Sequence, residues 1–134
     1  MSQFQSVEAL QAALTGHDYL AQDGLAVALY LALARNRPLF LEGEAGVGKT
    51  QIAKTLATVL NKPLIRLQCY EGLDISSAAY EWNYARQMID IQASNRVGGS
   101  TKETSLFSED YLIARPLLQA VRPPSGIAPV LLID

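Results

Sequence analysis

Gly43-Glu44-Ala45-Gly46-Val47-Gly48-Lys49-Thr50 is the stretch of this 134-residue sequence that decides its fold. It matches G-x-x-x-x-G-K-[S/T], a loop whose backbone N–H groups converge on a phosphate, and side chains at Gly46 and Gly48 would obstruct that curl. Lys49 is expected to reach the β- and γ-phosphates, and the hydroxyl of Thr50 is placed to hold Mg²⁺. The helix that begins here would direct the positive end of its dipole at the anion. The sequence therefore predicts a P-loop over residues 43–50.

The residues on either side have the pattern that a P-loop requires, a buried strand before it and a helix after it. Residues 38–41 are a short apolar run that enters the loop directly, and residues 49–60 carry a helical apolar stripe that Asn61 and Pro63 end. The glycine spacing excludes the G-x-G-x-x-G loops of dinucleotide-binding domains and kinases. A glycine-rich turn that binds nothing is the alternative.

Composition narrows the classes of protein. The net charge is −2, from 11 basic and 13 acidic residues, so no overall charge favours nucleic acid or an anionic membrane. The longest apolar run, residues 25–34, is half of the roughly 20 residues that a membrane span needs. Cys69 is the single cysteine, which excludes an intramolecular disulfide, and its apolar surroundings predict that it packs in a strand. We expect one soluble, cytoplasmic domain.

The remaining pattern predicts an α/β order. Helices are expected over residues 7–14 and about 20–36, and His17 and Asp18 between them are interpreted as loop residues and not as a catalytic pair. Residues 63–69 form a second strand, and the connection from residues 38–41 predicts that these two strands pair in parallel. Asp74 is the expected N-cap of a helix with an apolar stripe over residues 75–89. Residues 94–104 form a loop, and short helices follow Ser108 and cover residues 117–121.

Trp82 lies on that apolar stripe between Tyr80 and Tyr84. Packing in the core is favoured for it, and a base-stacking platform formed with the two tyrosines is the alternative.

The last five residues, Val130-Leu131-Leu132-Ile133-Asp134, place an aspartate directly after four apolar residues. This is the pattern of a Walker B segment, whose carboxylate holds Mg²⁺. Thr50 and Asp134 are therefore the predicted metal-side residues.

Five stretches together resemble the MoxR-type AAA+ ATPases over about residues 19–134: the P-loop and residues 64–74, 80–84, 106–109 and 130–134. The similarity is greatest to the branch associated with maturation of carbon monoxide dehydrogenase and related metalloenzymes. The resemblance implies a P-loop NTPase fold, a parallel sheet with flanking helices in three αβα layers. It also implies a ring-shaped, usually hexameric, ATP- and Mg²⁺-dependent chaperone, often with a von Willebrand factor A domain partner and here with a metalloenzyme client.

By position, the family's phosphate contacts fall on Gly43 to Thr50, with catalytic roles for Lys49 and Asp134, and its adenine contacts fall near residues 18–20. The family's water-activating glutamate, sensors, arginine finger and helical lid follow the aspartate. We therefore expect residues 1–134 to be a truncated, N-terminal part of one AAA+ domain, inactive alone. The family's strand order, 5-1-4-3-2, would leave the first strand unpaired. The alternatives are a non-hydrolysing nucleotide-binding module and another P-loop enzyme, such as a small-molecule kinase.

Overall fold

The computed structural model describes residues 4–44, 46–97 and 106–134. Three helices come first among the described elements, and strands then alternate with helical segments, as the α/β pattern predicts. The helices are α1 (Val7–Thr15), α2 (Asp23–Arg35), α3 (Lys49–Val59), α4 (Ile75–Ala78), α5 (Tyr84–Val97), the 3₁₀ turn η1 (Glu109–Tyr111) and α7 (Pro116–Val121). The strands are β1 (Leu64–Leu67), β2 (Tyr80–Trp82), β3 (Leu112–Ala114) and β4 (Val130–Ile133).

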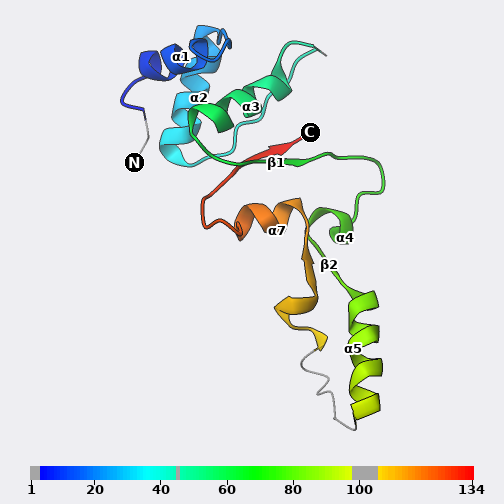
Figure 1. The fold of residues 1–134 in the computed structure, drawn as a ribbon. Helices are drawn as coiled ribbons and strands as arrows, with labels where there is room; N and C mark the ends of the chain where they lie inside the picture. Colours follow the sequence, from blue (N-terminus) through cyan, green and yellow to red (C-terminus); the bar gives the residue numbers. More distant parts are fainter. Residues whose placement is uncertain (1–3, 45, 98–105) are drawn as a thin grey trace.

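The hydrophobic core lies between α1, α2 and α3, which gather on one side of the molecule (Figure 1). The Oγ atom of Ser6 accepts a hydrogen bond from the N–H of Ala9 and so caps α1. Leu10 and Leu14 on α1 are fully buried. The other buried members of this cluster are Ala21, Ala26, Leu29, Ile52, Leu56 and Leu60. The core therefore packs helix against helix.

The strands β1 and β4 form a two-stranded parallel sheet, in the register Leu64↔Val130 to Leu67↔Ile133. The helix α3 packs against this sheet, and α7 contacts β1 from the other side (Figure 1). Helices thus lie on both sides of the two strands. The predicted strands over residues 63–69 and 130–133 are confirmed, although the first is shorter and ends at Leu67.

The strand predicted before the P-loop is not formed, because residues 38–44 lie outside any strand. Leu39 and Leu41 pack against the core cluster, whereas Phe40 is 85% exposed. The side chains alternate as they do in a strand, but no described strand pairs with this backbone. The predicted pairing of residues 38–41 with residues 63–69 is therefore wrong: β1 pairs with β4. The absence of a neighbour agrees with the unpaired first strand that the family resemblance implies.

The helix predicted over residues 75–89 is interrupted, which corrects the sequence interpretation. Asp74 caps α4 as predicted, but Tyr80–Trp82 then forms β2, antiparallel to β3, before α5 begins. The reason is tertiary, because the ladder to Leu112–Ala114 overrides the helical stripe. The ring of Trp82 lies edge-on to that of Phe107, with centroids 5.3 Å apart. Trp82 thus packs against an aromatic residue outside the main core and is not a member of the core cluster.

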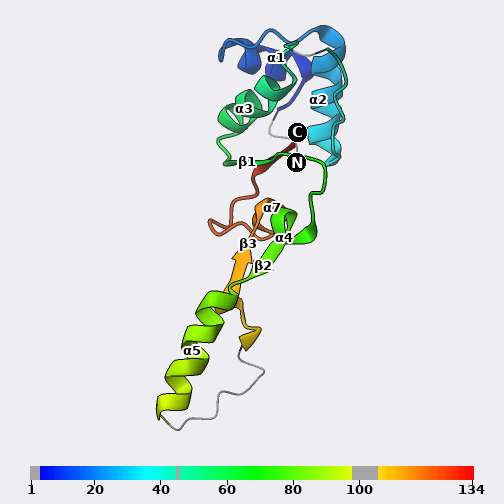
Figure 2. The same cartoon turned by 90° about the vertical axis from the view of Figure 1, so that its right-hand side faces the viewer.

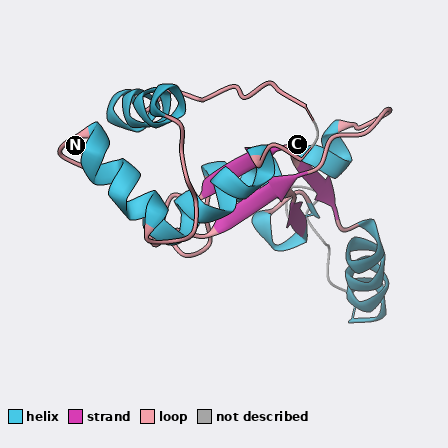
Figure 3. Ribbon diagram, turned by 90° about the horizontal axis from the view of Figure 1, so that it is seen from above, coloured by secondary structure: helices cyan, strands magenta, loops and turns pink. Residues whose placement is uncertain are grey.

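The antiparallel pair β2–β3 and α5 form an arm that extends away from the body of the molecule (Figure 2). Viewed from above, α5 lies well to one side of the parallel strands (Figure 3). The hydroxyl of Tyr111 donates to Asp90 on α5 at 2.7 Å, which ties the helix to η1.

The loop predicted over residues 94–104 is wrong at its start, because α5 continues to Val97. Residues 98–105 lie outside the described part.

The later short elements follow the prediction closely. Ser108 is the N-cap residue of η1, and α7 begins with Pro116 in its first turn, one residue before the predicted start. Within the described residues, no helix combines the length and apolar character needed to cross a membrane.

Candidate nucleotide-binding site

The backbone of the predicted P-loop explains its glycines. Gly46 and Gly48 have φ angles of 86° and 88°, in the left-handed region that side chains disfavour. A Cβ atom on Gly46 would meet no atom within 4 Å, so conformation and not crowding requires glycine there. Ala45, also predicted to contact phosphate, lies outside the described residues. The two glycines allow the chain to turn sharply into α3.

The side chain of Lys49 folds back over the loop from the first residue of α3. Its Nζ atom donates to the carbonyl oxygens of Gly43, at 2.6 Å, and Glu44, at 2.5 Å. An ammonium group has three N–H donors, so two carbonyls leave one donor for an anion. The side chain of Lys49 therefore connects the end of the P-loop to its beginning.

The N-terminus of α3 is suited to an anion. Gly48 is its N-cap residue and has no side chain that could accept from the first-turn N–H groups. Thr50, the second residue of the helix, is half-buried at this end. Backbone N–H groups and the positive end of the helix dipole thus favour an anion at the end of the helix where Lys49 and Thr50 lie.

Asp134 follows β4 directly, as predicted. Its N–H donates to the carbonyl of Leu67 at 2.9 Å, and its own carbonyl accepts from the N–H of Cys69 at 2.6 Å. The carboxylate accepts from Nη2 of Arg66 at 2.5 Å, and the two side chains are 33% and 47% exposed. The aspartate is thus held by backbone and side chain of the strand beside it.

The two halves of the predicted site lie at one end of the sheet. The helix α3 packs against β4, and the short connection from Leu60 to Leu64 makes it run opposite to β1. Because β1 and β4 are parallel, the start of α3 and the end of β4 face the same side (Figure 1). Ligands of open α/β sheets bind at this carboxyl end of the strands. Lys49, Thr50 and Asp134 therefore lie toward the same end of the parallel sheet.

The donor set fits Mg²⁺ bound to a nucleotide. The described residues contain no group of three or more His, Cys, Asp or Glu side chains that could hold a metal by themselves. Mg²⁺ usually takes one or two carboxylates together with substrate phosphates and water. One carboxylate at Asp134 and one hydroxyl at Thr50 are consistent with that coordination preference.

One residue near the site, Arg66, was missed in the sequence interpretation, and another, Cys69, was placed wrongly. Arg66 was not singled out, although a lone charge in the apolar run of β1 was the available signal. Cys69 was predicted to be buried in a strand, but it is an exposed free thiol beyond the end of β1. The strand ends two residues earlier than its apolar pattern suggests, which leaves Cys69 outside the packed layer. His17, in contrast, is a loop residue as predicted, with Nδ1 3.0 Å from the carbonyl of Ala13.

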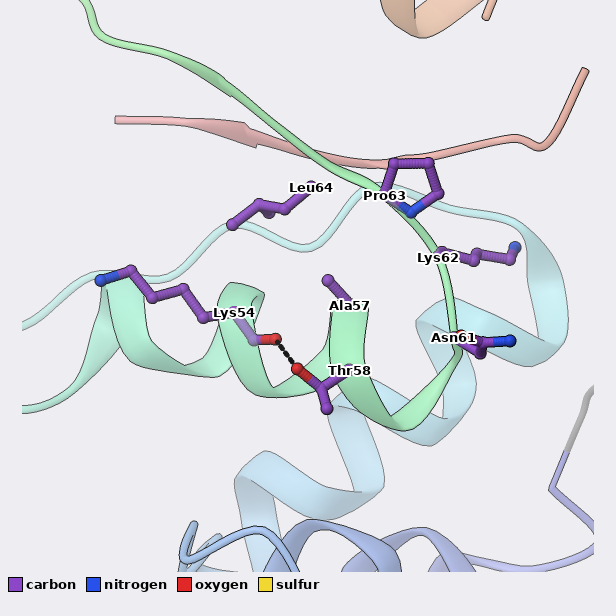
Figure 4. A pocket seen from close by; sticks show the side chains of 7 residues that line it. All are labelled: Lys54, Ala57, Thr58, Asn61, Lys62, Pro63 and Leu64. Carbon is purple, nitrogen blue, oxygen red and sulfur yellow. Dashed lines mark hydrogen bonds between the residues drawn. The ribbon is translucent and has the colours of Figure 1, made fainter. Parts of the chain in front are cut away.

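A surface pocket of about 580 Å³ lies at the opposite end of α3, around the turn into β1 (Figure 4). Its wall includes the hydroxyl of Thr58, which donates to the carbonyl of Lys54 at 3.1 Å. The pocket is lined by Lys54, Ala57, Thr58, Asn61, Lys62, Pro63 and Leu64. None of the predicted site residues contributes to it.

A glycine loop that opens a helix, beside a parallel strand ending in aspartate, defines the P-loop nucleotide-binding class. The chain belongs to the AAA domain family, dynein-related subfamily, which it matches over residues 38–106. It is also similar to Protein CbbQ of Allochromatium vinosum, with 43% identity over 51 residues, 37% of this chain and 69% of that protein. No solved structure gives a significant match. These matches confirm the resemblance to MoxR-type AAA+ ATPases.

Proposed function

We propose that this protein binds ATP with Mg²⁺ and that the whole protein couples ATP hydrolysis to remodelling or maturation of a metalloenzyme. The observation that carries the nucleotide part is the P-loop geometry: two left-handed glycines, a helix N-terminus without a side-chain cap and the ammonium of Lys49 bonded to the start of the loop. Membership of the AAA domain family supports the ATPase part. The client and chaperone parts come from the resemblance alone.

In this proposal each residue has one task. The N–H groups of residues 43–50 bind the phosphates, and Lys49 neutralises their charge. Thr50 and Asp134 hold Mg²⁺, which when bound supplies charge stabilisation at the phosphate oxygens. The bonds of the Lys49 ammonium to Gly43 and Glu44 hold the loop in shape before nucleotide binds. On binding, the ammonium would exchange part of this bonding for phosphate oxygens.

We further propose that residues 1–134 are the N-terminal part of one AAA+ nucleotide-binding domain. Val130 and Asp134 direct their N–H groups to β1, so in a parallel ladder Leu131 and Ile133 direct theirs to the opposite edge. No strand lies at that edge in the described part of the chain, and residues 38–42 have no strand partner either. A further strand between them would satisfy both. The family resemblance adds a homo-oligomeric, hexameric ring and a von Willebrand factor A domain partner to the proposal. The cytoplasmic location is proposed from the composition, which has a single cysteine.

The experiment for nucleotide binding compares Lys49→Ala with Lys54→Ala. Lys54 lies on the same helix, is exposed and loses the same charge, so it controls for net electrostatics. Loss of charge-assisted hydrogen bonds, roughly 1.5–3 kcal/mol, should weaken ATP binding about 10- to 100-fold in Lys49→Ala, measured by calorimetry. Circular dichroism should show both variants folded. Equal ATP affinity in the two variants would overturn the P-loop assignment.

The metal role of Thr50 needs a separate measurement. Thr50→Ala should reduce ATP affinity more in the presence of Mg²⁺ than in its absence, because only the metal-bound complex uses the hydroxyl. Thr58→Ala, on the same helix but lining the distant pocket, is the matched control. An equal loss with and without Mg²⁺ would contradict a metal role.

A further inference from the structure

We propose that Arg66 is a positioning residue that holds the carboxylate of Asp134 when no metal is bound and competes with Mg²⁺ for it. The inference rests on the proposed metal role of Asp134. Its basis is the ion pair of the two residues, with Nη2 of Arg66 2.5 Å from Oδ2 of Asp134. The oxygen that would serve the metal is thus already bonded to a cation of the protein itself.

The sheet register brings the two residues together although 68 positions separate them. Arg66 is paired with Leu132, and paired residues of a parallel ladder present their side chains to the same face. Asp134 is two positions beyond Leu132, so its side chain returns to that face. Its backbone is fixed at both groups, by Leu67 and Cys69. The long guanidinium side chain therefore reaches diagonally forward to a carboxylate whose position the sheet sets.

The pair is weak enough to be exchanged. Both side chains are partly exposed, and exposed ion pairs contribute little because water screens them. A guanidinium beside a site that receives a divalent cation also opposes that cation by like-charge repulsion. Both effects act in the same direction. Removal of Arg66 should therefore strengthen the metal dependence of nucleotide binding about two- to fivefold.

The measurement is the ratio of ATP affinity with Mg²⁺ to ATP affinity with a chelator, by calorimetry on the chain. Arg66→Gln should raise this ratio about two- to fivefold, and Arg66→Met should do the same if neutral charge is the cause. Arg66→Lys keeps the cation and should stay near the unaltered protein. Arg122→Gln is the matched control, since it removes another exposed arginine–carboxylate pair, Arg122 with Glu109, which involves none of the proposed site residues.

Asp134→Asn separates the two proposals. A lower ratio in Asp134→Asn supports the metal role of Asp134, and an unchanged ratio overturns that role. Given the lower ratio, an unchanged or reduced ratio in Arg66→Gln would overturn only the competition by Arg66. A rise in Arg122→Gln equal to that in Arg66→Gln would also overturn it, because the cause would then be general charge. Thermal unfolding of each variant confirms that the fold is retained.

Discussion

The ring of Tyr19 lies against Gly48, so that a Cβ atom on Gly48 would stand 3.7 Å from Cε2 of Tyr19 and 3.9 Å from its phenolic oxygen. Tyr19 also packs against the core cluster, and burial raises the pKa of its hydroxyl. The segment that the family resemblance assigns to adenine, residues 18–20, therefore lies beside the first turn of α3. Its adenine contact stays a prediction, but its place next to the P-loop is a property of the fold.

Gly48→Ala should destabilise the protein through the backbone. A contact of 3.7 Å is ordinary packing, whereas φ of 88° costs an L-residue roughly 1–2 kcal/mol. Gly24→Ala is the matched control, because Gly24 lies in α2 with φ outside the left-handed region and open space around it. That control should be stabilising by about 0.4–1 kcal/mol. Urea unfolding measures both, and equal effects would mean that the loop conformation is not as described.

Leu14→Ala should lower the free energy of unfolding by about 2–5 kcal/mol, because it opens a cavity between α1 and α2. Leu14 is fully buried, whereas Leu20 is 83% exposed and loses almost no packing when shortened. Leu20→Ala should therefore change stability by less than about 0.5 kcal/mol. Chemical denaturation of both variants checks the position of the core. A small effect of Leu14→Ala would place the core elsewhere.

Amide hydrogen exchange should separate the segment before the P-loop from α3. The N–H groups of Phe40 and Leu41 have no strand partner in the described part of the chain, whereas residues 52–59 are in a packed helix. We expect the opening free energy to differ by about 2.8 kcal/mol, so that exchange is about 100-fold faster at Phe40 and Leu41. Strong, equal protection in a demonstrated monomer would show that a neighbouring strand is present.

Asp74 predicts a pH-dependent contribution to stability. The N–H of Ser77 donates to its carboxylate at 2.9 Å, and this bond, with the hydroxyl of Ser76, lowers the pKa of Asp74. A lowered pKa in the folded state gives stability that is present above about pH 4 and is lost as the pH falls through the folded-state value.

Asp74→Ala should therefore be less stable than the unaltered protein at pH 7, with a gap that narrows at acid pH. Asp74→Asn keeps a cap acceptor without the charge, so its gap should be smaller at pH 7 and should narrow by a similar amount at acid pH, because the pH dependence belongs to Asp74 of the unaltered protein. Urea unfolding at pH 7 and pH 3 compares the three proteins. A gap of Asp74→Ala that is constant with pH would contradict a role for the charge.

Features that depend on nearby residues were predictable from the sequence. The P-loop is one, because Gly46 and Gly48 meet a local need for positive φ and Lys49 and Thr50 follow at fixed spacing. The Asp74 cap and the start of α7 at Pro116 are others, since capping and the fixed φ of proline act within a few residues. The four apolar residues before Asp134 likewise indicated β4 correctly.

Features that depend on which segment lies beside which were decided only by the tertiary structure. Tyr80–Trp82 is a strand and not a helical turn because Leu112–Ala114, about 30 residues later, supplies the ladder. Residues 38–42 have a strand's alternation but no strand, because backbone pairing needs a neighbour that a local pattern cannot show. Arg66 meets Asp134 for the same reason, since only the register of β1 with β4 brings a guanidinium to a carboxylate 68 positions away.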